Sequence, residues 1–141
     1  MNIIDAFFII KSDGIPLFSY SPSDELDPNL ISGFFSAIQS FSYEINTKRE
    51  SFINSLTLGN SVFNFLINPK HQLYFVSKSS KNVASALINR HLKIIEEKFL
   101  NRFEDDLKHF IGEVSVFENG FKPEFEKYFK DRFVKIKNIF G

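Results

Sequence analysis

The sequence contains no cysteine and no tryptophan, and it has a single methionine. The missing cysteines exclude disulfides, thiol nucleophiles and cysteine-based zinc or iron–sulfur sites. No basic-then-apolar signal pattern opens the chain, and no apolar run approaches the ~18 residues that a membrane span needs. From these absences we expect a protein of the reducing cytoplasm, with at most peripheral contact to a membrane.

The formal net charge is zero, because 17 basic and 17 acidic residues cancel. Binding to a phosphate backbone depends on a basic surface, so we expect no nucleic-acid partner. The charge is spread unevenly, since residues 1–45 carry a net charge of −5 and the remainder +5. This separation either orients the domain towards a partner or an anionic surface, or is ordinary solvated charge.

Motifs for catalysis and cofactor binding are equally scarce. The sequence has no phosphate-binding Gly-x-x-x-x-Gly-Lys or Gly-x-Gly-x-x-Gly and no Gly-x-Ser-x-Gly elbow. His71, His91 and His109 lack the spacing of a zinc site. Residues 78–81 (KSSK) either hold an anion at a helix start or cap that helix, and residues 104–106 either bind a hard cation or form a solvated helix end. We predict that the chain is not an enzyme and that it has no catalytic residue, no metal site and no cofactor.

The apolar content, 43% of 141 residues, is enough for one domain with a sizeable core. Five segments rich in β-branched and aromatic residues are predicted as strands: Ile4–Ile10, Ile15–Tyr20, Phe52–Leu58, Val62–Ile67 and Leu73–Val76. The first is apolar on both faces, which predicts a central strand. A Ser-Asp-Gly turn joins it to the second, where Pro16 lacks an N–H and indicates a sheet edge.

Three helices are predicted from apolar spacing. Asp27 and Pro28 begin the first, which covers about residues 28–45. The side chains of its apolar stripe, expected to face the core, are Leu30, Phe34, Ile38, Phe41 and Ile45. A long helix is expected to start at residues 79–82, with the stripe Ala84, Ile88, Leu92, Ile95, Phe99 and Phe103. Gly112 is expected to interrupt the helices, and residues 117–121 (FENGF) are predicted as a turn. The last helix has the stripe Phe121, Phe125, Phe129, Phe133, Ile136 and Phe140.

The resulting order, β-β-α-β-β-β-α-α, predicts an α+β fold with a five-stranded antiparallel sheet and three main helices. The hairpin IIDAFFIIKSDGIPLFSYS, the helix DPNLISGFFSAIQSFSYEI, the three-strand meander and the helix after SKSSKN resemble the longin-like domains of the longin/roadblock superfamily. That group includes adaptor light chains, TRAPP subunits and the N-terminal domain of the signal recognition particle receptor α-subunit. The resemblance covers about residues 3–103 of a single domain 1–141, with a helical extension at about 104–140. A profilin-like three-layer fold is the alternative.

The resemblance implies a non-enzymatic interaction module or scaffold in a trafficking-like or GTPase-regulatory complex. Its implied partner is a small GTPase, a GTPase regulator or another longin/roadblock chain, and a homodimer formed by sheet extension is possible. Strand Phe52–Leu58, free of charge and proline, is the candidate edge for that extension. Two alternatives stay open: a peripheral membrane protein that uses its basic C-terminal helix, and a small-ligand-binding domain.

Candidate partner-binding residues lie on the first helix and on this strand: Ile31, Gly33, Phe35, Ser36, Ala37, Ser40, Asn54 and Leu56. Ile31 and Phe35 lie on one shoulder of the apolar stripe, and the small residues form a flank on the other that permits close approach of another backbone. In one interpretation Phe35 is an exposed anchor and the small flank seats a partner. In the other, Phe35 completes the core stripe and the flank meets another helix of the same chain.

Overall fold

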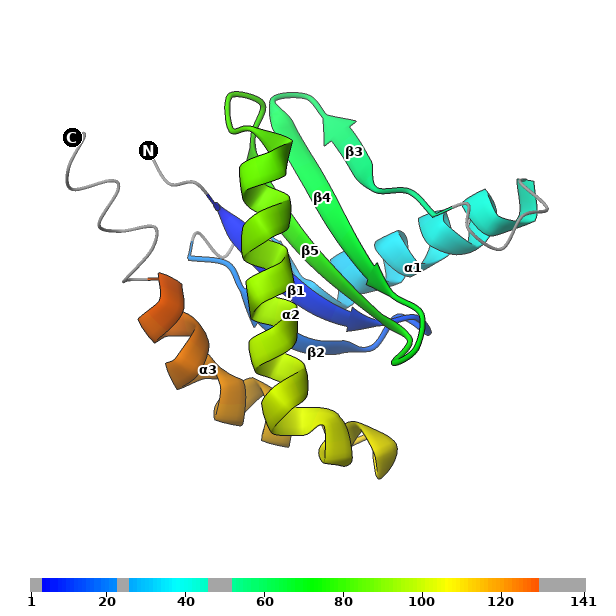
Figure 1. Cartoon of the computed structure of the whole chain (residues 1–141). Coiled ribbons are helices and arrows are strands. Elements are labelled where there is room, and N and C mark those ends of the chain that lie inside the picture. The colour runs from blue at the N-terminus through cyan, green and yellow to red at the C-terminus, as the bar shows by residue number, and fades with distance from the viewer. Residues whose placement is uncertain (1–3, 23–25, 46–51, 130–141) are drawn as a thin grey trace.

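The computed structural model describes residues 4–22, 26–45 and 52–129 (Figure 1). The strands are β1 (Ala6–Lys11), β2 (Pro16–Tyr20), β3 (Ser55–Leu58), β4 (Ser61–Asn68) and β5 (Leu73–Ser80). The helices are α1 (Pro28–Ile45), α2 (Ser85–Lys108) and α3 (Ser115–Phe129). This order confirms the predicted succession of elements.

The five strands form one antiparallel sheet in the order β2-β1-β5-β4-β3. Strand β1 is therefore an interior strand between β2 and β5, with β5 in the middle of the sheet, and the predicted edge positions of β2 and β3 are confirmed. Helix α1 crosses one face of the sheet, and α2 and α3 cover the other (Figure 1). The sheet thus separates α1 from the other two helices.

Strand β1 is buried on both faces because its alternate side chains enter two different cores. Phe7 and Ile9 belong to the cluster under α2 and α3, whereas Phe8 and Ile10 belong to the cluster under α1. The first cluster is largely aromatic, and the ring of Phe7 stacks on that of Phe125 at a centroid distance of 4.9 Å.

The turn between β1 and β2 has the predicted chemistry. Gly14 has φ of +97°, a conformation that favours glycine, and the Asp13 carboxylate accepts a hydrogen bond from the Ile15 N–H at 3.4 Å. Pro16 pairs with Ile10 where the register of the ladder shifts. The turn is a structural feature of the hairpin.

The predicted helix start at residues 79–82 is wrong. Strand β5 continues to Ser80, with Lys78 opposite Ala6 of β1 and Ser80 opposite Ser61 of β4. Strand pairing on both sides supplies this stretch with ladder hydrogen bonds, which outweigh the single bond of a serine cap. Helix α2 starts at Ser85, so the KSSK stretch is not the anion site at a helix start that we considered.

The predicted turn at residues 117–121 is also wrong, because this stretch lies inside α3. A Cβ on Gly120 would lie 3.0 Å from Cζ of Phe103 on α2, so the glycine allows the two helices to approach closely. Packing here overrides the turn preference of Asn-Gly. The break between the helices is at Gly112, with φ of +100°, as expected.

Candidate protein-interaction surface

Helix α1 is rotated about its axis relative to the prediction, so that its apolar stripe faces solvent and polar residues face the core. Leu30, Phe41 and Ile45 of its apolar stripe are 75%, 65% and 61% exposed. The side chains that α1 buries are Ser32, Phe35 and Gln39, two of which are polar. The expectation that the apolar stripe faces the core is therefore wrong.

An aromatic contact with the sheet fixes this rotation of α1. The Phe35 ring lies against the rings of Phe63 and Phe65 on β4, with centroid distances of 5.0 Å to each. Phe35 is completely buried, so the hypothesis of an exposed Phe35 anchor is wrong. Ile31, another predicted partner-binding residue, is half-buried against the same cluster.

The small-residue flank of α1 meets the β1–β2 hairpin. The Ser36 hydroxyl donates a 2.6 Å hydrogen bond to the Ser12 carbonyl, and a Cβ on Gly14 would lie 3.7 Å from the Gly33 Cα. The expected contact of this flank with another helix is wrong, since α2 and α3 lie across the sheet (Figure 1).

Three residues of the flank remain open on their outer side. Gly33, Ala37 and Ser40 are exposed, and a Cβ built on Gly33 meets nothing within 4 Å. The packing among the described residues therefore does not require glycine at position 33.

Strand β3 supplies the other part of the candidate surface. Within the described part of the chain it pairs with β4 alone, and residues 52–58 contain no charge and no proline. Asn54 is exposed and Leu56 is half-buried against the α1-side cluster. Exposed edge strands are usually protected by charge, proline or a covering segment, and this stretch lacks the first two.

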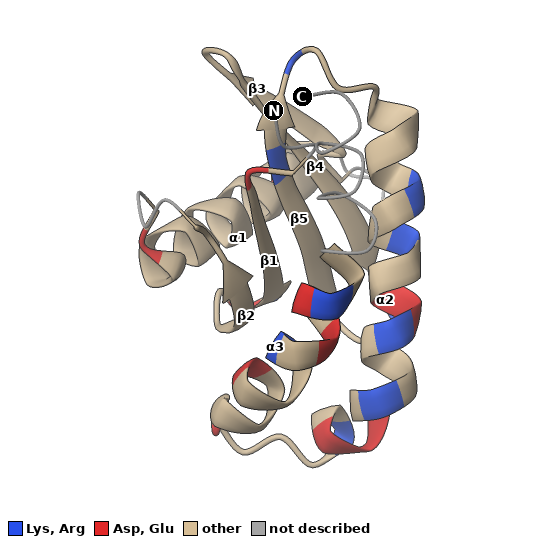
Figure 2. Ribbon diagram, turned by 90° about the vertical axis from the view of Figure 1, so that its left-hand side faces the viewer, with Lys and Arg blue, Asp and Glu red and all other residues tan. Residues whose placement is uncertain are grey.

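We call a set of exposed small and apolar residues of α1, together with strand β3, the α1–β3 surface. Its members are Leu30, Gly33, Phe34, Ala37, Phe41 and Ile45 of α1 and Ser55–Leu58 of β3. Glu44 is the sole charged residue of α1, and the charged positions gather on α2 and α3 (Figure 2). The surface is thus apolar and almost uncharged.

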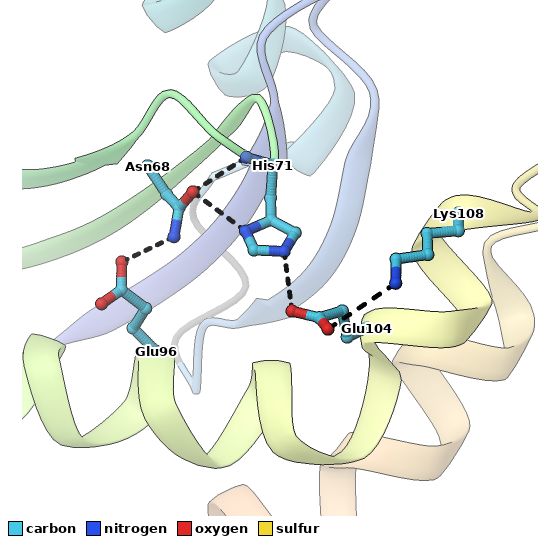
Figure 3. A network of polar contacts seen from close by, with 5 residues as sticks. All are labelled: Asn68, His71, Glu96, Glu104 and Lys108. Carbon is cyan, nitrogen blue, oxygen red and sulfur yellow. Dashed lines mark hydrogen bonds and ion pairs between the residues drawn. The ribbon is translucent and has the colours of Figure 1, made fainter.

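The most extensive polar network in the described residues ties the β4–β5 turn to α2 (Figure 3). Nδ1 of His71 lies 3.1 Å from Oδ1 of Asn68, and its Nε2 lies 3.0 Å from the Glu104 carboxylate. Asn68 donates to Glu96 at 3.1 Å, and Lys108 lies 3.8 Å from Glu104. Among residues 4–22, 26–45 and 52–129 no three His, Asp or Glu side chains gather as metal ligands. We call this network the clamp, because its contacts hold the β4–β5 turn against α2.

The other two histidines also make structural contacts. His91 is buried on α2 and hydrogen-bonded through Nδ1 to the Tyr128 hydroxyl of α3. His109 follows the end of α2, and its Nδ1 lies 2.9 Å from the Asp105 carbonyl. The first contact joins α2 to α3, and the second lies at the C-terminal end of α2.

The hollows of the described chain are shallow. One of about 330 Å³ lies beside β2 and is lined by residues 15–19, Pro28, Asn29, Val114 and Glu118. A ligand site usually combines an apolar cavity with several convergent polar groups, and Glu118 is the only charged residue in this lining. The small-ligand alternative gains no support here.

No protein-family model and no curated protein sequence matches this chain. Solved structures do. The mammalian SRP receptor matches at a TM-score of 0.59 with 10% identity, over 93% of this chain and 95% of that one. MglB of Myxococcus xanthus matches at 0.56 with 12% identity, over 72% and 85%.

The chain has a longin-like fold. The strand order, the helix placement and these structural neighbours agree on it, and they confirm the predicted fold class over the profilin-like alternative. At such low identity the likeness concerns the longin-like fold alone.

Proposed function

We propose that this chain is a non-enzymatic interaction module that pairs through the α1–β3 surface with a second longin-like domain, in the first place its own copy. We further propose that the pair belongs to a GTPase-associated complex, in which a small GTPase or its regulator is the other partner. The resemblance to longin-like domains supports the second part. The geometry of α1 supports the first.

The single observation that carries the proposal is the outward apolar stripe of α1. A helix of a monomer gains stability when its apolar stripe turns inward, at roughly 25 cal/mol per Å² of apolar surface buried. Here α1 buries Ser32 and Gln39 and leaves Leu30 and Phe41 in water. Contiguous exposed apolar surface of this kind marks a protein–protein contact.

The shape of the α1 face suits a second copy. Gly33 and Ala37 are small, exposed residues one turn apart, which we call the notch, and the exposed Phe34 and Phe41 lie on the same side of the helix at about 100° per residue. In an antiparallel pair about a twofold axis, the aromatic side chains of one copy can enter the notch of the other. Glu44 lies near one end of a helix about 27 Å long, so the two Glu44 carboxylates would lie at opposite ends.

The uncharged edge of β3 offers a separate contact with a further copy, because the apolar face of α1 points away from the sheet whereas β3 pairs within its plane. A twofold axis can bring two β3 edges together as neighbouring antiparallel strands, which would satisfy their free N–H and C=O groups. The extended sheet would then continue across that contact with both α1 helices on one side.

A membrane is a weaker candidate for the same surface. Interfacial helices usually combine an apolar face with lysine and arginine, and α1 contains neither. On α3, Phe117, Phe121, Phe125 and Phe129 are buried in the core, while the predicted stripe residues Phe133, Ile136 and Phe140 lie outside the described residues. Within the described segments, none of the helices has the length and apolarity that a membrane crossing requires.

The test is the mass of the full chain in solution, measured by light scattering over a range of concentrations. We expect a dimer, and we expect Phe41→Glu to convert it to a monomer. Ile111→Glu is the matched control, because Ile111 is 92% exposed and lies in the α2–α3 connection. A wild-type chain that stays monomeric at high concentration would contradict self-pairing.

The GTPase part needs its own titration. Purified small GTPases from the same organism, loaded with GDP or a GTP analogue, would be titrated with the full chain in a calorimeter. Binding in one nucleotide state supports this part. Absence of binding in both states would remove the GTPase from the proposal and leave self-pairing unaffected.

A further inference from the structure

Gln39 makes an unusual contact for a helix side chain. It is 1% exposed, and both polar atoms of its amide bind the backbone of one residue. Its Nε2 donates to the Ile53 carbonyl at 2.8 Å, and its Oε1 accepts from the Ile53 N–H at 2.8 Å. Two such bonds to one residue are the pattern of a hydrogen-bonded pair in an antiparallel ladder. The Gln39 amide thus acts as a one-residue strand partner for Ile53.

The next residue binds the sheet. The Asn54 carbonyl accepts a 2.9 Å hydrogen bond from the Phe65 N–H of β4, and β3 begins at Ser55. Ile53 therefore binds the Gln39 side chain of α1, and the next residue, Asn54, binds β4. Both contacts lie immediately before the start of β3. The Ile53 side chain is half-buried and packs against the α1-side cluster.

We infer that Gln39 is a positioning residue that holds the β3 edge in register with the exposed face of α1. The inference rests on the proposed function, since it concerns how the two parts of the α1–β3 surface are presented together. A partner that contacts both parts needs them at a fixed separation and angle, and pre-organisation of this kind strengthens binding. Gln39 contacts the chain's own backbone and acts through it.

The test compares two substitutions of Gln39 with a matched control. Gln39→Met keeps the length of the side chain and removes both hydrogen bonds, and Gln39→Glu keeps the acceptor but removes the donor to the Ile53 carbonyl. Ser32→Ala is the control, because Ser32 is equally buried on α1 and its hydroxyl has no hydrogen-bond partner in the described part of the chain. All measurements use the full chain.

Two readouts separate positioning from general stability. In both Gln39 variants we expect the amides of Ile53 and of β3 to exchange faster with solvent, while those of β1 and β5 stay protected. We expect self-association to weaken by about tenfold or more, with Ser32→Ala unchanged in both readouts. If Gln39→Met fails to fold, Gln39→Glu alone decides the question.

The contradicting results are distinct. A Gln39 variant whose Ile53 amide exchanges fast while β3 stays protected, or while self-association keeps its wild-type strength, would overturn the positioning role. A wild-type chain that does not self-associate would overturn self-pairing, and exchange at Ser55–Leu58 in the variants would still decide whether Gln39 holds β3.

Discussion

The ring of Phe35 meets the ring of Phe65 edge-on, with centroids 5.0 Å apart and planes at 90°. This contact ties the inner face of α1 to β4 and so determines that the neighbouring Phe34 points outward. Two adjacent phenylalanines in the sequence thus have opposite roles. One stabilises the fold, and the other is available to a partner.

Substitution of these two residues separates the roles. We expect Phe35→Ala to lower the free energy of unfolding by about 3–5 kcal/mol, because it leaves a cavity against β4. Phe34→Ala should change it by less than about 1 kcal/mol, since Phe34 is 46% exposed. Urea denaturation of both substitutions in the Phe41→Glu background, where pairing does not contribute to the apparent stability, measures the difference, and equal losses would show that α1 is rotated differently in solution.

Gly33→Ala should act in opposite directions on stability and on pairing. Alanine raises helix stability by about 0.5–1 kcal/mol over glycine, and a Cβ here meets nothing within 4 Å. The same methyl group fills part of the notch and should weaken self-association. Thermal unfolding would be measured in a Phe41→Glu background, where pairing does not contribute to the apparent stability. An increase in self-association would contradict the proposed notch.

A charge on the β3 edge should interfere with sheet extension. Thr57 is exposed, and Thr57→Lys places a charge on a strand that has none. We expect weaker self-association and, in the Phe41→Glu background where pairing does not contribute, a free energy of unfolding within about 0.5 kcal/mol of the chain without the Thr57 substitution. Thr57→Val, which keeps the β-branched shape, is the control. Sedimentation velocity of the three proteins would show whether the edge takes part.

The clamp between the β4–β5 turn and α2 should matter for stability alone. The His71 imidazole lies 3.0 Å from a Glu104 carboxylate that is 43% exposed, so solvent screens the pair. A double-mutant cycle of His71→Ala and Glu104→Gln should give a coupling of about 0.5–1 kcal/mol. Self-association should stay at the wild-type level in all three variants. A loss of association would mean that the turn belongs to the interface.

Much of the fold was predictable because local signals agreed with packing. The two-sided apolar run of β1, Pro16 on β2 and the Asp27–Pro28 helix start all have the positions that the sequence indicated. The Asn29 N–H binds the Asp27 carboxylate at 2.9 Å, as an N-cap should. The stripe of α2 from Ile88 to Phe103 is buried as expected.

The orientation of α1 could not be predicted from its own sequence. Periodicity finds an apolar face but does not say whether that face meets the core or a partner. The burial of Phe35 and Gln39 depends on the Phe63–Phe65 pair and on Ile53, which are distant in the chain. The polar residues Ser32, Ser36 and Gln39 at helical spacing around Phe35 were the signal that a second face existed.

The most direct test of the central claim uses the absence of cysteine. Ala37→Cys introduces the sole thiol of the chain near the middle of the exposed face of α1. If two α1 helices pack antiparallel at the notch, the two Cα atoms at this position come within the roughly 4.4–6.8 Å that a disulfide spans. We predict a covalent dimer of Ala37→Cys under mild oxidation, visible on a non-reducing gel, and a monomer of Ile111→Cys under the same conditions. Equal cross-linking of both variants, or none at Ala37→Cys, would contradict pairing through α1.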